Sequence, residues 1–390
     1  MKKTVIYFGN FILPDCNAAA HRVVSVGKIL REIGYNTVYL GIGDPDERFD
    51  GLRSVENSYG FDMFESAYPA GNIEWVKRLT DVSGIEQLIK KYQGVREIIL
   101  YNAPYATVCA ASKLAKKYNI KLLFDCTELC DVTEGSLAKR IIKKADAYFT
   151  KNSMPKKIDG LIVISSFMER FFEKFQKPMV RLTPLVDIGD PIWHGTPIKS
   201  AYKKSFCFAG TIDASKDFVN EIVKAFTQIT DPDIGLDVVG VAEEDFKNKY
   251  PDILPAGGSK NITFFGRLSH AETIAHVLGA DYYIFIRPSD LRNNAGFPTK
   301  FTEAATSGAP IITTNVSDIG DYIGKSIKGY IVSDTNAETI KKTVLKAAAD
   351  FDPQEKADRE LLAVFDYRSN VLKLADWIGE LIISYALTQK

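Results

Sequence analysis

Short apolar runs alternate with helix-period segments along the chain. Residues 4–8 form an apolar run, and residues 17–33 then place aliphatic side chains on one helical face up to a stop signal at Gly34. Residues 36–42 form a second apolar run. This order of strand, loop, long helix and strand predicts the right-handed parallel unit of a doubly wound sheet.

The same alternation continues to about residue 175. Each predicted strand is almost continuously apolar, as a sheet covered on both faces requires. The further strands are predicted at 97–101, 121–126 and 161–165, and the helices at 104–118, 135–149 and 166–175.

A segment rich in Gly, Pro and Lys interrupts the pattern at 188–204, and a second alternation follows it. Its strands are predicted at 205–209, 235–240, 261–265, 281–287, 310–314 and 329–332, with a helix at 214–230. The sequence therefore predicts an α/β protein of two Rossmann-like, doubly wound parallel-sheet domains facing across a cleft. The expected parts are a first domain at 1–187, a linker at 188–204, a second domain at 205–368, and a helical segment at 369–390 as a candidate to cross back to the first domain.

Composition and charge agree with two folded globular domains. The 390 residues are 46% hydrophobic and 25% charged, and the 49 basic and 49 acidic side chains give no global field that would attract nucleic acid. Residues 1–187 nevertheless carry 27 basic and 22 acidic side chains, a net charge of +5. This excess could favour an anionic acceptor or an anionic membrane surface, although scattered surface lysines explain it as well.

The cysteines and histidines suggest neither a disulfide framework nor a metal site. The five cysteines form no C-x-x-C pair, and none of the four histidines pair at metal-ligand spacing.

The first twenty residues resemble a secretory signal peptide. However, Gly9-Asn10 and Pro14 interrupt the apolar stretch, which fits a first strand and loop better. Since no run approaches the ~20 apolar residues of a membrane span, we expect a cytoplasmic protein with at most peripheral contact at the inner face of the membrane.

The strongest local signal is the strand 206–209 followed by Gly210-Thr211 and by Lys216. A glycine at a strand tip lets an anion approach backbone N–H groups, and a lysine on the next helix supplies charge for a diphosphate. Alone the pattern is weak, because a glycine after a strand and a lysine on an early helical turn are common.

The second signal lies at 296–310, directly after the apolar strand 281–287. Pro298 suits the first helical position, where the N–H groups of Thr299 and Lys300 would point toward a phosphate. Glu303, one turn further, could accept hydrogen bonds from a ribose diol. It could equally be a solvated residue paired with Lys300.

These elements occur in the order and spacing of family 4 of the GT-B glycosyltransferases, which the chain resembles over nearly its whole length. The resemblance is carried by Gly210 to Lys216, by the strand-glycine segments 238–240 and 264–268, and by the stretch 303–311, which matches the family's E-A-x3-G-x-P-[IV] ending. Residues 159–165 and 183–187 look like the family's elements before the linker. The resemblance implies a retaining enzyme that uses a nucleotide sugar. The donor-binding residues it implies are Gly210, Thr211, Lys216, Gly266, Arg267, Leu268, Arg287, Gly296, Phe297, Pro298, Thr299, Lys300 and Glu303.

Two positions depart from the family pattern. The family's Arg after the strand glycine is Thr211 here, and its first acidic residue of E-x7-E is Ala295. The resemblance implies that Lys300 could supply the charge that Thr211 lacks, with Arg287 and Arg292 as further candidates. The alternative is that both arginines are surface partners of Asp290 and neighbouring carboxylates.

No metal or other cofactor is expected. The D-x-D pattern, which can coordinate a divalent metal ion, occurs at 44–46 and 231–233. In both places the central residue is a proline in a predicted turn, where Asp is favoured as a turn former. Charge on the leaving diphosphate would then be neutralised by lysine, arginine and helix N-termini, with Lys216 in the catalytic role.

For the acceptor side, the candidates lie at the carboxyl ends of the first domain's strands. Asp125 and Glu128 follow a buried strand and are candidate proton acceptors for an acceptor hydroxyl, although Asp125 could instead cap the next segment. Asn10, Asn17 and His21 flank the first loop and are candidate acceptor contacts. The basic segment 135–149 could rest on anionic lipid or be a solvated helix face.

The expected function is transfer of a sugar from a nucleotide sugar to a glycan or lipid-linked acceptor, with surface polysaccharide biosynthesis as the expected setting. Two alternatives stay open. One is a nucleotide-sugar epimerase on the same fold, and the other is a catalytically silent sugar-nucleotide-binding subunit of a glycan assembly complex.

Overall fold

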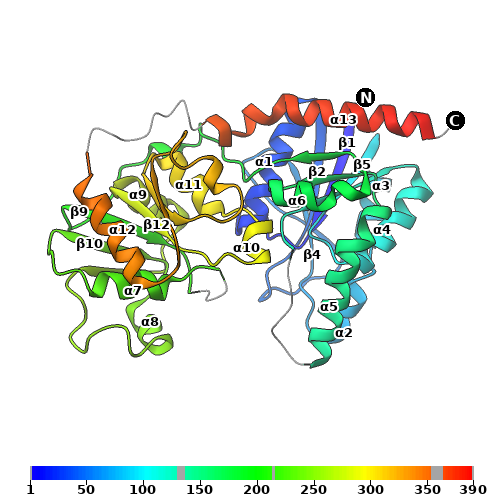
Figure 1. Ribbon diagram of the computed structural model, residues 1–390. Helices are drawn as coiled ribbons and strands as arrows, with labels where there is room; N and C mark the ends of the chain where they lie inside the picture. The colour runs from blue at the N-terminus through cyan, green and yellow to red at the C-terminus, as the bar shows by residue number, and fades with distance from the viewer. Residues whose placement is uncertain (1, 130–136, 213–215, 353–362, 389–390) are drawn as a thin grey trace. The chain divides into compact units, whose positions relative to one another are not determined.

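The structure, a computed structural model, describes residues 2–129, 137–212, 216–352 and 363–388 (Figure 1). The chain divides into two compact units, one formed by Met1–Leu185 with Tyr367–Lys390 and the other by Val186–Asp366. Residues 188–204, predicted as a linker, contain the short 3-10 helix η3 (Pro191–His194) and lie in the second unit. Each unit is described by itself below.

The first unit is built on an eight-stranded sheet with the order β3-β4-β2-β1-β5-β6-β7-β8. All neighbouring strands are parallel except the pair β3 and β4. The order reverses between β1 and β5, which is the switch point where doubly wound sheets bind ligands beyond the carboxyl ends of their strands. The strands are β1 (Lys3–Gly9), β2 (Tyr35–Ile42), β3 (Leu52–Ser54), β4 (Asp62–Ser66), β5 (Val95–Tyr101), β6 (Lys121–Cys126), β7 (Gly160–Val163) and β8 (Met179–Arg181).

Helices cover this sheet, and its strands β1, β2, β6 and β7 are buried along nearly their whole length. β6, for example, is buried at all six positions. The helices are α1 (Ala18–Glu32), α2 (Asn72–Arg78), α3 (Ser83–Lys91), α4 (Tyr105–Tyr118), α5 (Leu137–Asn152), α6 (Ser166–Phe172) and α13 (Val371–Thr388), with the 3-10 turns η1 (Met154–Lys156), η2 (Glu173–Phe175) and η6 (Tyr367–Asn370).

Helix α13 supplies part of this unit's core although it lies at the far end of the chain. Leu374, Trp377 and Leu381 are buried in one cluster with side chains of α1, β7 and β8. At Gly160 a Cβ atom would lie only 2.8 Å from the Trp377 ring, so the glycine makes room for the indole. Figure 1 shows α13 in red beside the blue α1.

The second unit is built on a six-stranded parallel sheet with the order β11-β10-β9-β12-β13-β14. Counted along the chain, this is the 3-2-1-4-5-6 order of a dinucleotide-binding fold, with its switch point between β9 and β12. The strands are β9 (Lys204–Ala209), β10 (Ile234–Val239), β11 (Ile262–Gly266), β12 (Tyr282–Phe285), β13 (Ile311–Thr314) and β14 (Gly329–Val332). The helices are α7 (Val219–Thr227), α8 (Glu243–Lys249), α9 (His270–Gly279), α10 (Leu291–Ala295), α11 (Thr299–Ser307) and α12 (Ala337–Ala349), with the turn η4 (Ile319–Asp321).

The predicted fold class of two Rossmann-like parallel-sheet domains is confirmed by these two sheets. The segment that imitates a secretory signal forms β1, in the interior of the first sheet. The predicted helix 214–230 begins later than expected, at Val219, and residues 213–215 lie outside the described residues. None of the helices in the described part of the chain is long and apolar enough to cross a membrane.

Candidate functional site

A buried carboxylate gathers two cations at the switch point of the second sheet. Asp217 is 4% exposed and accepts hydrogen bonds from Arg287 Nε at 2.8 Å and Lys300 Nζ at 2.6 Å. Burial alone would raise the pKa of Asp217, but the charges of Lys300 and Arg287 outweigh burial and lower it. Two positive groups are therefore held in fixed positions by one negative group.

Each member of this cluster comes from a segment that follows a strand. Asp217 lies between β9 and α7, Arg287 follows β12, and Lys300 is the second residue of α11. The backbone of Arg287 is fixed because its N–H donates to Thr314 Oγ1, which in turn donates to the Arg287 carbonyl. The alternative that Arg287 is only a surface partner of a neighbouring carboxylate is wrong, since its partner is buried and 70 residues away.

Gly210 provides the space that Lys300 occupies. A Cβ atom at position 210 would lie 1.9 Å from Lys300 Nζ, which sits 4.6 Å from the centroid of the Phe208 ring. The backbone N–H of Gly210 itself donates to the carbonyl of Val239 at 2.9 Å. The glycine serves the lysine side chain.

Lys216 and Thr211 lie at the same end of β9. Lys216 is partly exposed and stands in a turn three residues before α7, not on the helix as predicted. Thr211 is exposed directly after Gly210.

Burial lowers the pKa of Lys300, and the negative charge of Asp217 opposes that effect.

The start of α11 differs by one residue from the prediction. Pro298 is the N-cap, and Thr299 is the first helical residue. The N–H groups of Thr299 and Lys300 belong to the first turn, which has no intrahelical acceptor for them. The helix N-terminus can therefore still receive an anion next to the Lys300 side chain.

The other residues around α11 divide into surface and core positions. Glu303 is 35% exposed, and its Oε1 lies 3.8 Å from His270 Nε2, whereas Lys300 pairs with Asp217 rather than with Glu303. Phe297 is buried against Phe301, Tyr322 and Phe365, so its ring belongs to the core rather than to a ligand surface. The Gly296 carbonyl accepts a hydrogen bond from Ser317.

Ala295, where the family pattern has an acidic residue, is 0% exposed. A carboxylate at this position would be buried, which is costly without a paired charge. The packing around α10 therefore favours the small, apolar Ala295 over the acidic residue of the family pattern.

The segment Gly266-Arg267-Leu268 ends β11 and leads into α9. The Gly266 N–H donates to the Val241 carbonyl, while Arg267 is exposed and Leu268 is partly exposed. These residues lie at the carboxyl edge of the same sheet.

In the first unit, Asp125 does not face solvent. Its side chain is 0% exposed and binds Arg22 through Nε and Nη2, with a shortest distance of 2.7 Å, and Tyr7 donates to it at 2.5 Å. Arg22 also donates to the Leu182 carbonyl. Both expectations for Asp125, a proton acceptor facing the site or a cap of the next segment, disagree with this placement in a buried ion pair.

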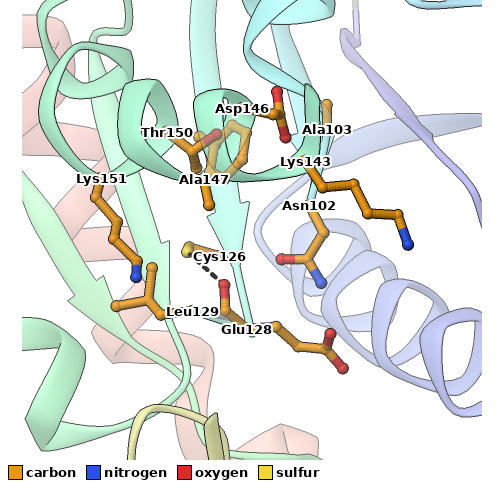
Figure 2. A pocket seen from close by; sticks show the side chains of 11 residues that line it. Asn102, Ala103, Cys126, Glu128, Leu129, Lys143, Asp146, Ala147, Thr150 and Lys151 are labelled. Atoms are coloured by element: carbon orange, nitrogen blue, oxygen red, sulfur yellow. Dashed lines mark hydrogen bonds between the residues drawn. The ribbon is translucent and has the colours of Figure 1, made fainter. Parts of the chain in front are cut away.

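Glu128 lies at a cavity of about 200 Å³ that is closed on one side by α5 (Figure 2). Its carboxylate is exposed, and its backbone carbonyl accepts a weak hydrogen bond from the Cys126 thiol. Lys143 and Lys151 line the same cavity. Glu128 remains the accessible carboxylate of the two that the sequence predicted.

The three candidate acceptor contacts have different roles. Asn17 is the N-cap of α1 and accepts a hydrogen bond from the Ala20 N–H. His21 lies in the first turn of that helix and is partly exposed. Asn10 is exposed after β1, and its Oδ1 accepts a hydrogen bond from Arg78 at 3.3 Å.

The two Asp-Pro-Asp segments form local turns. Asp44 Oδ1 accepts a hydrogen bond from the Asp46 N–H, and Asp231 Oδ1 accepts one from the Asp233 N–H. Within the described ranges, no group of three or more His, Cys, Asp or Glu side chains could hold a metal ion.

Sequence reasoning missed Asp217 and Arg78. Asp217 directly follows Lys216, and a counter-charge for the two cations Arg287 and Lys300 could have been sought among nearby acids. Arg78 gave no signal, because α2 has no buried residue and therefore no amphipathic period.

Part of the chain matches a known family model, and nearly the whole chain is similar in fold to solved structures. Residues 195–360 match the family described as glycosyl transferases group 1. Among solved structures, the chain is similar to sucrose-phosphate synthase from Thermosynechococcus elongatus, with 16% identity, a TM-score of 0.73, and coverage of 98% of this chain and 100% of that one. No curated protein sequence matches.

Two further solved structures are similar to this chain in fold. A glycosyltransferase from Rickettsia africae has 16% identity and a TM-score of 0.68, with coverage of 98% and 99%. HepE from Anabaena in complex with UDP has 10% identity and a TM-score of 0.67, with coverage of 97% and 100%.

These likenesses show the GT-B fold. The segment that matches glycosyl transferases group 1, residues 195–360, lies in the second unit.

Proposed function

We propose that the protein is a retaining GT-B glycosyltransferase of family 4. It moves a hexosyl group from a nucleoside diphosphate sugar to a glycan or lipid-linked acceptor in surface polysaccharide biosynthesis. The observation that carries the proposal is the pair of cations, Arg287 and Lys300, held on buried Asp217 at the switch point of the second sheet. This cluster lies inside the segment that matches glycosyl transferases group 1.

The cluster suits the charge that the reaction creates. When the bond between the anomeric carbon and the diphosphate breaks, its electrons pass to the leaving phosphate oxygen. Groups already positioned for that charge stabilise the transition state most. Lys300, Arg287 and Lys216 supply positive charge, and the first N–H groups of α11 add hydrogen bonds. Glu303 is assigned to the ribose hydroxyls of the donor.

UDP sugars are the first donors to test. HepE, which shares the fold, was solved with UDP. The protein would be incubated with UDP-, GDP- and ADP-sugars, with and without acceptors, and the products analysed by NMR and mass spectrometry. We expect transfer with the donor's anomeric configuration retained.

The same product analysis separates the alternatives. An epimerase would convert the donor sugar without any acceptor. A silent binding subunit would bind the donor, measured as a thermal shift, and yield no product. A transferred sugar with inverted configuration would reject the retaining mechanism.

Peripheral membrane contact is part of the proposal. Helix α5 exposes Ile141 and Ile142, at 61% and 58%, next to Lys143 and Lys144, which are also exposed. Apolar side chains flanked by basic ones favour the surface of an anionic bilayer at the inner face of the cell membrane.

Liposome flotation tests this contact. Replacing Lys143 and Lys144 with Gln should weaken binding to anionic vesicles, while the matched pair of exposed residues Lys156 and Lys157 should tolerate the same change. Binding that resists high salt, or that both double variants share equally, would argue against an electrostatic contact at α5.

A further inference from the structure

A partly exposed arginine lies at the carboxyl edge of the first sheet. Arg78, the last residue of α2, donates from Nη1 to Ser66 Oγ at 2.6 Å and from Nη2 to Asn10 Oδ1 at 3.3 Å. Ser66 ends β4 and Asn10 follows β1, so both partners lie at the end of the sheet where doubly wound folds bind their ligands.

The charge of Arg78 has no counter-ion among the described residues. Both hydrogen-bond partners are neutral oxygens, and no carboxylate of that part of the chain lies within 4 Å of its guanidinium. Burial lowers the pKa of Arg78, and the Asp81 carboxylate opposes that effect from further away. A partly buried cation without a paired carboxylate favours the binding of an anion.

Arg78 borders a cavity large enough for a ligand. The cavity has a volume of about 290 Å³ and is lined by Arg78, Lys77 and Ser66 together with Glu74 and Asp81. Both carboxylates already accept a hydrogen bond from a backbone N–H, Glu74 from Ala70 and Asp81 from Ser83, the first residue of α3. The two cations pair with neither of these carboxylates and remain able to bind an anion.

A smaller cavity of about 40 Å³ adjoins the other side of Arg78. It is lined by Asn10, Trp75 and Tyr101. The Trp75 indole packs edge-on against Tyr68, which lines the larger cavity. The Arg78 guanidinium lies 6.0 Å from the centroid of the Phe8 ring, which lines both cavities. An aromatic ring beside a planar cation suits a ligand with both a sugar or polyol ring and a charged group.

We propose that this cavity binds the anionic part of the acceptor, a phosphate carried by a sugar or polyol, with Arg78 as its direct contact. The inference rests on the proposed function, since it assigns the acceptor class for that reaction. A guanidinium suits phosphate because its parallel N–H groups bind two oxygens at once. The net charge of +5 on residues 1–187 agrees with an anionic acceptor.

Calorimetric titration of the full chain tests the site. Glucose 6-phosphate and glucose serve as a charged and a neutral probe. We expect the phosphate ester to bind about 10- to 100-fold more tightly than glucose, as a charged hydrogen bond allows. Arg78→Gln should abolish this preference, and Arg78→Lys should restore it in part. Arg170→Gln removes the same charge from an exposed position of α6, the helix that follows β7, and should change nothing.

A second pair of titrations identifies the source of the phosphate. Short-chain phosphatidylinositol, kept below its micelle concentration, represents a lipid head group, and glucose 6-phosphate represents a free sugar phosphate. Arg78-dependent binding of either probe supports the site, and the tighter probe indicates the source. Equal affinity for glucose and both phosphates, or phosphate binding that survives Arg78→Gln, would overturn the proposal.

Titration of UDP into the same samples separates this result from the proposed function. Arg78→Gln should leave UDP affinity unchanged, because the donor cluster lies in the other unit. A protein that binds no nucleotide at all would refute the donor assignment, while the phosphate titrations would still decide the role of Arg78.

Discussion

Lys300 and Asp217 form a buried ion pair, with Nζ 2.6 Å from Oδ2, across 83 residues of sequence. The pair joins the first turn of α11 to the segment before α7, and Arg287 completes it from the end of β12. The donor-side cations therefore depend on an acid that does not itself need to contact the donor.

Replacing Asp217 with Asn should destabilise the protein strongly. Breaking a buried ion pair leaves an uncompensated charge and costs about 3–5 kcal/mol. Denaturant unfolding measures the loss, with Asp217→Glu as the variant that keeps the charge. Asp233→Asn, which breaks a pair that is 45% exposed on the acidic side, should cost less than about 1 kcal/mol. Similar losses in Asp217→Asn and Asp233→Asn would contradict a special role for the buried carboxylate.

Gly210→Ala should impair both donor binding and stability. The new Cβ would displace Lys300 Nζ from its ion pair with buried Asp217, and position 210 has a φ of +158°, where a side chain is strained. UDP affinity should fall about as much as in Lys300→Met, by roughly 1.5–3 kcal/mol, and the double variant should lose little more. Gly257→Ala, at a position with open space, is the control. Additive losses in the double variant would show that the two residues act separately.

Lys216→Ala and Glu303→Gln should affect catalysis differently. Lys216 acts on charge that grows as the diphosphate leaves, so its loss should lower kcat, at a cost of about 2–4 kcal/mol. Glu303 is assigned to the ribose, whose contacts hardly change during the reaction, so its loss should mainly raise the donor KM. Steady-state kinetics separates the two effects, with exposed Lys224→Ala as a control. Wild-type kinetics in both variants would remove these residues from the donor site.

Transfer should persist in EDTA. The sequence offers neither a credible D-x-D motif nor paired histidines, and both Asp-Pro-Asp segments are occupied with their own turns. Activity would be measured after chelation and again after adding Mn²⁺ or Mg²⁺. Complete loss that either ion restores would establish a metal-dependent mechanism instead.

Glu97 should make stability depend on pH near neutrality. It is 4% exposed, one carboxylate oxygen has no hydrogen-bond partner among the described residues, and burial raises its pKa to about 7. The unfolded chain releases this proton near pH 4.5, so stability should fall as pH rises from about 4.5 to 7, by up to about 3 kcal/mol. Glu97→Gln should flatten that part of the curve and stabilise the protein at about pH 8. Exposed Glu56→Gln should retain the wild-type curve.

Many strands of the two sheets could be predicted because they are nearly continuous apolar runs. Buried β6 was predicted with the bounds that the structure has and buried β9 to within one residue. β14 was also predicted with its observed bounds, although only Val332 of its residues is buried. The prediction contained no counterpart of β3, β4, α2 or α3. β4 alternates buried and more exposed positions near a sheet edge, and α2 buries no side chain, so neither leaves a strong period.

The donor site was predicted in its parts but not in its arrangement. Lys300 and Arg287 were identified as candidate cations, whereas the carboxylate that holds them was not, because pairing across 70 or more residues leaves no local pattern. The roles predicted for Asp125 disagree with the structure for a related reason. Its partner Arg22 lies on the buried face of α1, and only the fold brings the two together.

The position of α13 has a consequence for the order in which the protein is made. Leu374, Trp377 and Leu381 complete a core whose other members are found from β1 onward. During synthesis, the strands of the first unit leave the ribosome long before these residues are made. The apolar surface that α13 covers therefore stays exposed during that time. The second unit, contained in Val186–Asp366, can complete its sheet earlier. In newly made chains the second unit should therefore fold before the first. The first unit should be accessible to chaperones and proteases until α13 has been synthesised.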